Sequence, residues 1–245
     1  MTDTQTAKLQ FFVYVVESPS APDLYHQRSE SDLLRRALNL NNIQCVSRCA
    51  ISRTAFSAAL KIGMTEEMER FKGLFPLLHI STHGHSEGLQ LSNDEVILWR
   101  ELADLLVPIN RALQSRLVVA MSCCEGYSGV RMAMRADRPD LPFYALVGSP
   151  EKPTWAETAV AFTTFYHQLA RGVHITDAVN AMRIASGRNS FFVQWGENTR
   201  QGYLDYLKDL KDIDVQKVQN DLRDQVETQL PEDTAKMTLL EKGNA

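Results

Sequence analysis

The chain has 245 residues, of which 44% are hydrophobic and 23% are charged, and its formal net charge is −4. These values predict a globular domain with a sizeable core and exclude a general polyanion-binding protein, so we expect no direct nucleic-acid partner. The first apolar run, residues 9–16, is too short to cross a bilayer and lacks the basic flank of a signal peptide. We therefore expect a cytoplasmic protein with no membrane partner.

Strand-like and helix-like segments alternate along the chain. Apolar runs rich in Val, Ile, Leu and aromatic residues predict strands at 9–16, 43–51, 76–82, 116–122, 143–149 and 190–196. Apolar residues at helical spacing predict helices at 29–42, 54–63, 101–114, 155–171 and 174–187. We expect the second helix to end at Gly63 and the third to break at Pro108. Because the strand runs are continuously apolar, the predicted fold class is α/β, a three-layer sandwich whose mostly parallel central sheet has helices on both faces.

The character of the chain changes near residue 199. The segment 200–228 carries Leu, Ile and Val at three- and four-residue spacings among charges of both signs, which predicts an amphipathic helix. We therefore predict a main domain over residues 1–198 and a charged amphipathic helical extension over 199–245. The helix at about 200–226 is either a docking surface for a partner or packs back on its own domain.

Four cysteines are too few for a disulfide scaffold, so the reactivity of the thiols is the question they raise. Cys45 and Cys49 lie in a predicted strand and are expected at core or edge positions. Cys123 and Cys124 are adjacent and follow the strand predicted at 116–122. The strand predicted at 76–82 ends at His83 and Gly84. Because the carboxyl ends of parallel strands meet at one edge of a sheet, this arrangement predicts a cysteine nucleophile beside a histidine base.

These residues resemble a known family. The segments "LLHISTHGHSEG" (77–88) and "RLVVAMSCCEG" (116–126) are similar to the caspase-like peptidases of the CHAT type, which are related to caspases, metacaspases and separase. The helix pair over 156–185 resembles that of the family in its Phe-Tyr-x-x-Leu-x-x-Gly pattern. The likeness runs through about residues 74–196. It implies a caspase-like sandwich that cleaves a protein substrate as a cysteine endopeptidase and needs no cofactor and no metal.

The resemblance assigns roles to individual residues. It makes Cys124 the nucleophile and His83 the general base and acid, and it gives the oxyanion hole to the amides of Gly84 and Cys124. A position at the start of a helix and beside an imidazole is expected to give Cys124 thiolate character. Successive side chains of an extended chain face opposite ways, so Cys123 is expected to point away, into the slot where the family has a small residue. Cys123 could also form a vicinal disulfide with Cys124, although such a bond is strained.

The substrate pocket is the part that departs most from the family pattern. The turn after Cys124 is longer than usual, and "VGSPEKPTW" (147–155) replaces the common Ser-Leu-Trp pattern. The residues expected to line the pocket are His85, Ser122, Glu125 and Ser149. Four acidic residues are expected near the pocket: Asp137, Asp140, Glu151 and Glu157. They are either solvated loop acids or, if one of them lines the pocket, the basis of a preference for cleavage after Arg or Lys.

Two other functions compete with peptidase activity. The string "STHGHSEG" (81–88) superficially resembles the metal-binding string of metallo-β-lactamase-like hydrolases, with His83 and His85 as ligands. It has Glu87 and Gly88 where that pattern has Asp and His. The other alternative is a catalytically silent caspase-like module that only binds partners. A peptidase needs control, so we expect a regulatory protein partner or a second copy of the chain to activate it. Proteolysis in defence, including antiviral defence, or in a stress response fits what such families do.

Overall fold

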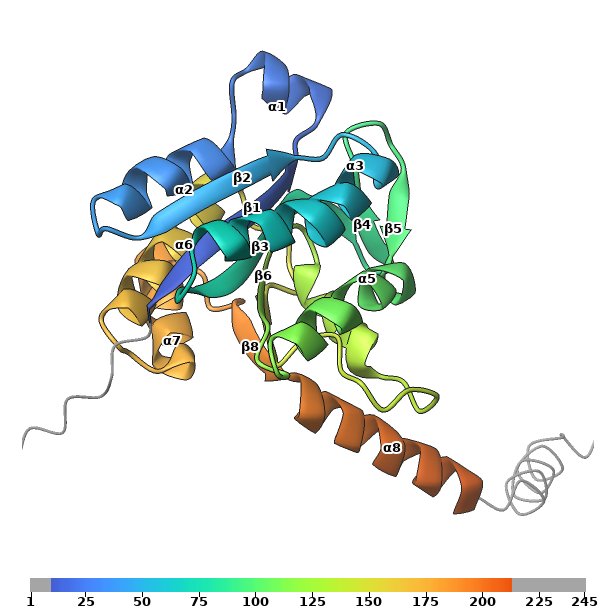
Figure 1. Cartoon of the computed structure of the whole chain (residues 1–245). Helices are drawn as coiled ribbons and strands as arrows, with labels where there is room; N and C mark the ends of the chain where they lie inside the picture. The colour runs from blue at the N-terminus through green and yellow to red at the C-terminus, as the bar shows by residue number, and fades with distance from the viewer. Residues whose placement is uncertain (1–9, 213–245) are drawn as a thin grey trace, which may run out of the picture. The chain divides into compact units, whose positions relative to one another are not determined.

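A computed structural model of the chain describes residues 10–212. Its centre is a sheet in the strand order β2-β1-β3-β6-β7-β8 (Figure 1). The strands are β1 (Phe11–Ser18), β2 (Gln44–Cys49), β3 (Phe75–His85), β6 (Val118–Ser122), β7 (Ala145–Gly148) and β8 (Phe192–Trp195). Every neighbouring pair along this path is parallel except β7 with β8. A hairpin of β4 (Gly88–Gln90) and β5 (Val96–Leu98) extends from the end of β3.

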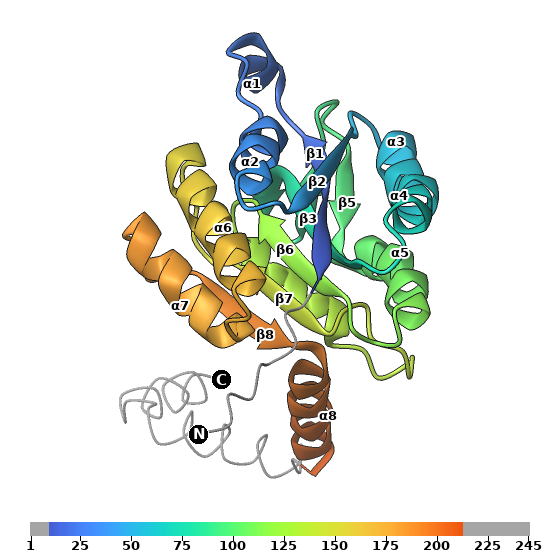
Figure 2. The ribbon, with the colours of Figure 1, turned by 60° about the vertical axis from the view of Figure 1, so that its left-hand side comes forward.

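Helices cover both faces of the sheet (Figure 2). One face carries α2 (Glu30–Asn39), α6 (Trp155–Ala170) and α7 (Ile175–Ser186). The other carries α3 (Arg53–Ala58), the π-helical turn Ala59–Gly63, α4 (Met64–Arg70) and α5 (Trp99–Ala112). Two short helical segments remain between residues 10 and 195, α1 (Ala21–Tyr25) and the 3₁₀ helix Gly126–Ala133. The predicted three-layer α/β architecture with a mostly parallel sheet is confirmed.

The continuous apolar runs are explained by two separate cores. In β1, Phe12, Tyr14 and Val16 face the core under α3, α4 and α5, whereas Val13 and Val15 face the core under α2, α6 and α7. Because successive side chains of a strand alternate between faces, a strand covered on both sides must be apolar at every position.

Two predicted helix boundaries are wrong. The helix predicted to end at Gly63 continues through this glycine into α4. Gly63 is needed there for close packing, since a Cβ would lie 2.5 Å from the hydroxyl of Tyr14. The helix predicted to break at Pro108 is continuous, so α5 accommodates a proline that donates no backbone hydrogen bond.

The chain divides into two compact units between Gln201 and Gly202. α8 (Gly196–Asp212) is the described part of the helical extension predicted from residue 199, and the rest of that extension lies outside the described residues. Within residues 10–212, no helix is both long enough and apolar enough to cross a membrane.

The core under α6 generates a stability prediction. Phe162 is fully buried and makes edge contacts with His79 and Phe191. Phe162→Ala should lower the free energy of unfolding by about 3–5 kcal/mol, measured by urea denaturation, because it leaves a cavity between α6 and the sheet. The control is Ile184→Ala on α7, where the side chain is 84% exposed, and there the expected change is within about 0.5 kcal/mol. Equal effects of the two substitutions would contradict this description of the core.

Candidate active site

The parallel pairing of β3 with β6 ends at the carboxyl edge of the sheet, although β3 does not stop at His83 as predicted but continues to His85, where it pairs with β4. The two strands are parallel, and Ser81 is paired with Ser122 at the end of the register. His83 follows two residues after Ser81, and Cys124 follows two residues after Ser122. The two segments pack closely, since a Cβ at Gly84 would lie 2.5 Å from the carbonyl oxygen of Cys124. Only glycine allows this approach of the two backbones.

His83 and Cys124 share one small pocket of about 60 Å³. Its other lining residues come from the same strand ends and from the start of α6: Thr82, Ser122, Cys123, Pro153, Trp155 and Thr158. Apart from the imidazole, this lining has no ionisable side chains other than the two thiols. The sheet therefore brings together the two residues that the sequence predicts as a nucleophile and its base.

The two cysteines of the doublet differ in environment. Cys123 is only 4% exposed and belongs to the core under α5, where burial, together with Cys124 and Glu30, raises the pKa of its thiol far above the ordinary value. Cys124 is half-buried. Burial raises the pKa of the Cys124 thiol too, and Glu125 adds to this while Lys152 opposes it. Cys124 is therefore the more accessible of the two, and both stay protonated at neutral pH.

One expectation about the doublet needs correction. Cys124 does not gain thiolate character, because burial raises the pKa of its thiol. It also does not start a helix, since the next helix is a 3₁₀ helix that begins at Gly126. Cys123 is buried in the core under α5, as expected, although it is also among the residues that line the pocket. The alternation of the strand continues to this residue, since Met121 and Cys123 lie in the core under α5 whereas Ser122, between them, bonds to Glu30.

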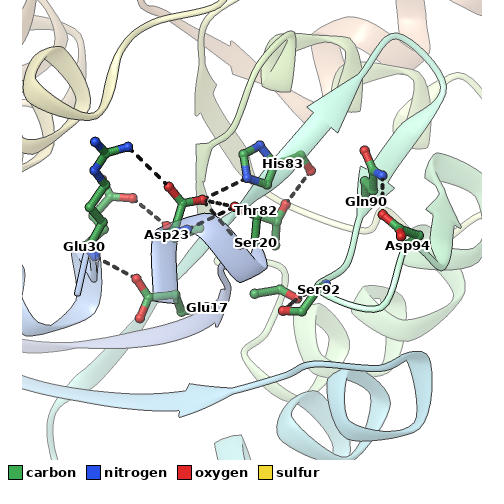
Figure 3. Close-up of polar contacts among 12 residues, drawn as sticks. Glu17, Ser20, Asp23, Glu30, Thr82, His83, Gln90, Ser92 and Asp94 are labelled. Atoms are coloured by element: carbon green, nitrogen blue, oxygen red, sulfur yellow. Dashed lines mark hydrogen bonds and ion pairs between the residues drawn. The ribbon is translucent and has the colours of Figure 1, made fainter. Parts of the chain in front are cut away.

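Asp23 is a site residue that the sequence analysis missed. Its Oδ2 lies 3.1 Å from Nε2 of His83, and its Oδ1 lies 3.8 Å from the guanidinium of Arg28 (Figure 3). Asp23 is 4% exposed and also accepts hydrogen bonds from the backbone and the hydroxyl of Ser20. Burial alone would raise the pKa of Asp23, but the hydrogen bonds from Ser20 and His83 outweigh burial and hold this pKa below 3.8. The ionised carboxylate therefore fixes the orientation of the imidazole.

Only part of the evidence that Asp23 belongs to the site can be recognised in the sequence. The pattern Ser20-Ala-Pro-Asp23 is typical of a capping box, and the structure has this box at the start of α1. Nothing local to that pattern points to a histidine 60 residues away. Among the described residues, the imidazole of His83 hydrogen-bonds to Asp23 and not to the thiol of Cys124.

Of the four residues expected in the substrate pocket, Ser122 lies in its wall. The other three have different partners. His85 accepts a hydrogen bond from the amide of Glu87 at 3.2 Å. Glu125 lies 3.6 Å from the ammonium of Lys152, and Ser149 is fully buried and donates to Ser190 at 3.1 Å. None of these three residues is among those that line the pocket.

The four acidic residues considered for a basic substrate are all paired with arginines. Arg135 binds Asp137, Arg111 binds Asp140, and Arg188 binds both Glu151 and Glu157. None of the four lines the pocket beside Cys124. In the part of the chain that the structure describes, no group of three or more His, Cys, Asp or Glu side chains is arranged to hold a metal ion. The His83 and His85 string thus has no third ligand within that range.

Comparisons with known proteins give likenesses among solved structures. No family model matches the chain, and no curated protein matches it. Among solved structures, it is similar to a secreted C11 cysteine protease from Bacteroides thetaiotaomicron in complex with an irreversible peptide inhibitor. The TM-score is 0.48 at 8% sequence identity, over 73% of this chain and 58% of the other. The chain thus spans less than two thirds of that protein, and a likeness of this size does not place it in a family.

The burial of the thiols predicts their reactivity. Iodoacetamide at neutral pH should alkylate Cys49 and Cys124 in the native protein and leave Cys45 and Cys123 unmodified, as read by peptide mass spectrometry. Burial raises the pKa of Cys45 to about 12 and that of Cys123 further, whereas Cys49 is exposed and Cys124 half-buried. Because the pKa of Cys124 is raised, its alkylation rate should still increase when the pH rises above 9. In denaturant all four should react, and native modification of Cys123 in preference to Cys124 would contradict the assignment.

Proposed function

We propose that the chain is a cysteine endopeptidase of the caspase-like, CHAT type that hydrolyses peptide bonds of a protein substrate. The observation that carries this proposal is the shared pocket of His83 and Cys124 at the ends of two adjacent parallel strands. A thiol, an imidazole and a carboxylate that orients the imidazole are the three parts of a nucleophilic cysteine site. Here Asp23 is the orienting carboxylate.

The proposed reaction follows from these positions. His83 takes the proton from the Cys124 thiol, and the thiolate attacks the carbonyl carbon of the substrate. The amides of Gly84 and Cys124 donate hydrogen bonds to the oxyanion of the tetrahedral intermediate. His83 then protonates the leaving amine, and the C–N bond breaks to leave a thioester on Cys124. Water attacks this acyl-enzyme with His83 as base, and this step releases the acid product and restores the thiol.

Activation is part of the proposal. The thiol of Cys124 is protonated at neutral pH, and the hydrogen bond of His83 is made to Asp23 through Nε2, which leaves Nδ1 for the thiol. We propose that a regulatory protein partner or a second copy of the chain moves the strand ends until this nitrogen meets Cys124. Such control suits a cytoplasmic enzyme that acts in defence, antiviral defence included, or in a stress response. The charged helix that begins with α8 is the proposed docking element.

A catalytically silent interaction module is the second candidate function. The observation that favours it is the absence, among residues 10–212, of a hydrogen bond between His83 and Cys124. The two functions differ in whether a peptide electrophile reacts at Cys124 once a partner is added.

A labelling experiment tests the peptidase proposal. A biotinylated peptide acyloxymethyl ketone should label the wild-type chain, alone or with its partner, and Cys124→Ala should abolish labelling because the nucleophile is lost. His83→Ala should slow labelling by about 100-fold because the base is lost. Cys49→Ala removes an exposed thiol at the end of β2 and should label as the wild type does.

Two results would count against this assignment. Labelling that persists in Cys124→Ala but disappears in Cys123→Ala would move the nucleophile to Cys123. Turnover that survives all three substitutions at His83, Cys123 and Cys124 but is abolished by a chelator would favour metal-dependent hydrolysis.

Asp23→Asn tests the orienting role of the carboxylate. We expect kcat on a fluorogenic peptide to fall by about 10- to 100-fold with little change in KM, because the imidazole loses its charged partner. The pKa of Asp23 is lowered by folding, so its carboxylate stabilises the wild type above pH 3.8, and this advantage over Asp23→Asn should disappear as the pH falls below that value. The control is Asp32→Asn, which removes an exposed aspartate paired with Arg35 and Arg36. Equal kcat values in the two variants would exclude the orienting role.

A further inference from the structure

A row of three buried polar side chains crosses the centre of the sheet at its carboxyl edge. Glu17 of β1 is paired with Ser81 of β3, and Ser81 is paired with Ser122 of β6. All three side chains are buried. Burying a polar group costs free energy unless the group has a hydrogen-bond partner, so these three side chains need partners.

Glu30, the first residue of α2, binds all three members of this row. Its Oε2 accepts a hydrogen bond from the hydroxyl of Ser81 at 2.6 Å, and its Oε1 accepts one from Ser122 at 2.8 Å. Its backbone amide donates to the carboxylate of Glu17 at 2.6 Å, the contact drawn between these residues in Figure 3. One residue thus joins three adjacent strands at the edge where the candidate site lies.

The carboxylate of Glu30 is held as an anion inside the protein. It is 3% exposed, and within residues 10–212 no lysine or arginine pairs with it. The nearest basic group is Nε2 of His79, at 3.5 Å, whose Nδ1 lies 2.9 Å from the hydroxyl of Tyr166. Burial raises the pKa of Glu30, but His79 and the two serine hydroxyls outweigh burial and lower it. Charge-assisted hydrogen bonds of this kind are stronger than neutral ones.

Each proposed reaction group lies a short distance along the chain from this network. His83 follows Ser81 by two residues, and Cys124 follows Ser122 by two residues. The loop that carries Asp23 begins after β1, which contains Glu17, and ends at Glu30 itself. Each serine is therefore close enough along the chain to influence the position of the nucleophile or of the base.

We propose that Glu30 is a positioning residue that sets the distance between His83 and Cys124 by binding Ser81 and Ser122 at once. This role rests on the proposed peptidase function. The link that Glu30 makes between the ends of β3 and β6, through its hydrogen bonds with Ser81 and Ser122, can be measured without that function. Glu30 touches neither the substrate nor the reacting atoms and acts only through the two strands.

The test uses the full chain with its activator and compares Ser122→Ala, Ser81→Ala and Glu30→Gln. Each alanine variant removes one hydroxyl from the carboxylate, so kcat on a fluorogenic peptide should fall by about tenfold or more with KM unchanged, because small displacements of reacting groups are costly. Glu30→Gln keeps one acceptor and gains one donor, so both serines remain bonded, and its kcat should stay within about threefold of the wild-type value.

The matched control is Asn110→Ala at the opposite end of β6. Asn110 is buried and joins the amide of Leu117 to the carbonyl of Leu141 at 2.9 and 2.8 Å. Its loss should lower the melting temperature about as much as Ser122→Ala does but leave kcat and KM per folded molecule unchanged. If Ser122→Ala and Ser81→Ala behave like Asn110→Ala, with lower melting temperatures and unchanged kcat, the positioning role is overturned.

Hydrogen exchange separates this proposal from the peptidase function. Amides at 82–84 and 123–125 should exchange at least about tenfold faster in Ser122→Ala, and both segments should keep wild-type rates in Glu30→Gln and Asn110→Ala. If the wild-type protein turns over no peptide but the variants show this exchange pattern, the peptidase proposal fails, and the link that Glu30 makes between the strand ends is still supported. If the exchange rates of the two segments are the same in Ser122→Ala and in the wild type, Glu30 does not link the strand ends, and this conclusion holds for any measured kcat.

Discussion

The parallel pairing of β3 with β6 is the interaction on which the candidate site depends. It runs from Leu77 opposite Val118 to Ser81 opposite Ser122, in the middle of the sheet, with an apolar core on each face. A slip of one residue in this register would turn every side chain of β6 to the opposite face, so the two cores fix it firmly. The same register delivers His83 and Cys124 to one pocket and leaves room there only for a glycine at position 84.

The candidate site lies over a network of buried hydrogen bonds and beside two loops that are bonded to each other. Below the pocket, Glu30 and the row of Glu17, Ser81 and Ser122 hold the strand ends. Beside it, the amide of Glu125 donates to the carbonyl of Glu151, and Tyr127 donates to the carbonyl of Ser149, so the turns after β6 and β7 are joined by backbone hydrogen bonds. A protein partner that displaced these turns would act directly on the residue next to Cys124. Under the peptidase proposal, such a displacement would be the event that activates the protonated thiol.

Under the peptidase proposal, the surroundings of the pocket also bear on substrate choice. The carboxylates near the loops after β6 and β7 are engaged by Lys152 or Arg188, and the pocket wall carries serine, threonine, proline and tryptophan side chains. A positively charged substrate side chain would lose its hydration there without gaining an opposite charge. Of the two alternatives for the acidic residues near the site, pairing in solvated loops is the one that the contacts support.

The sequence by itself determined the layered architecture and the two residues at the strand ends. Continuous apolar runs specify strands buried on both faces, and helix ends at Gly172 and Gly187 follow from their left-handed conformations. These signals are local, so they can be seen in a single sequence. Only the tertiary structure decided the partners of Asp23 and Glu30, because His83 is 60 residues from Asp23, and Ser81 and Ser122 are 51 and 92 residues from Glu30. It also decided the protonation of Cys124 and the wall of its pocket, since burial and charge at one point depend on segments that the chain brings together only when it folds.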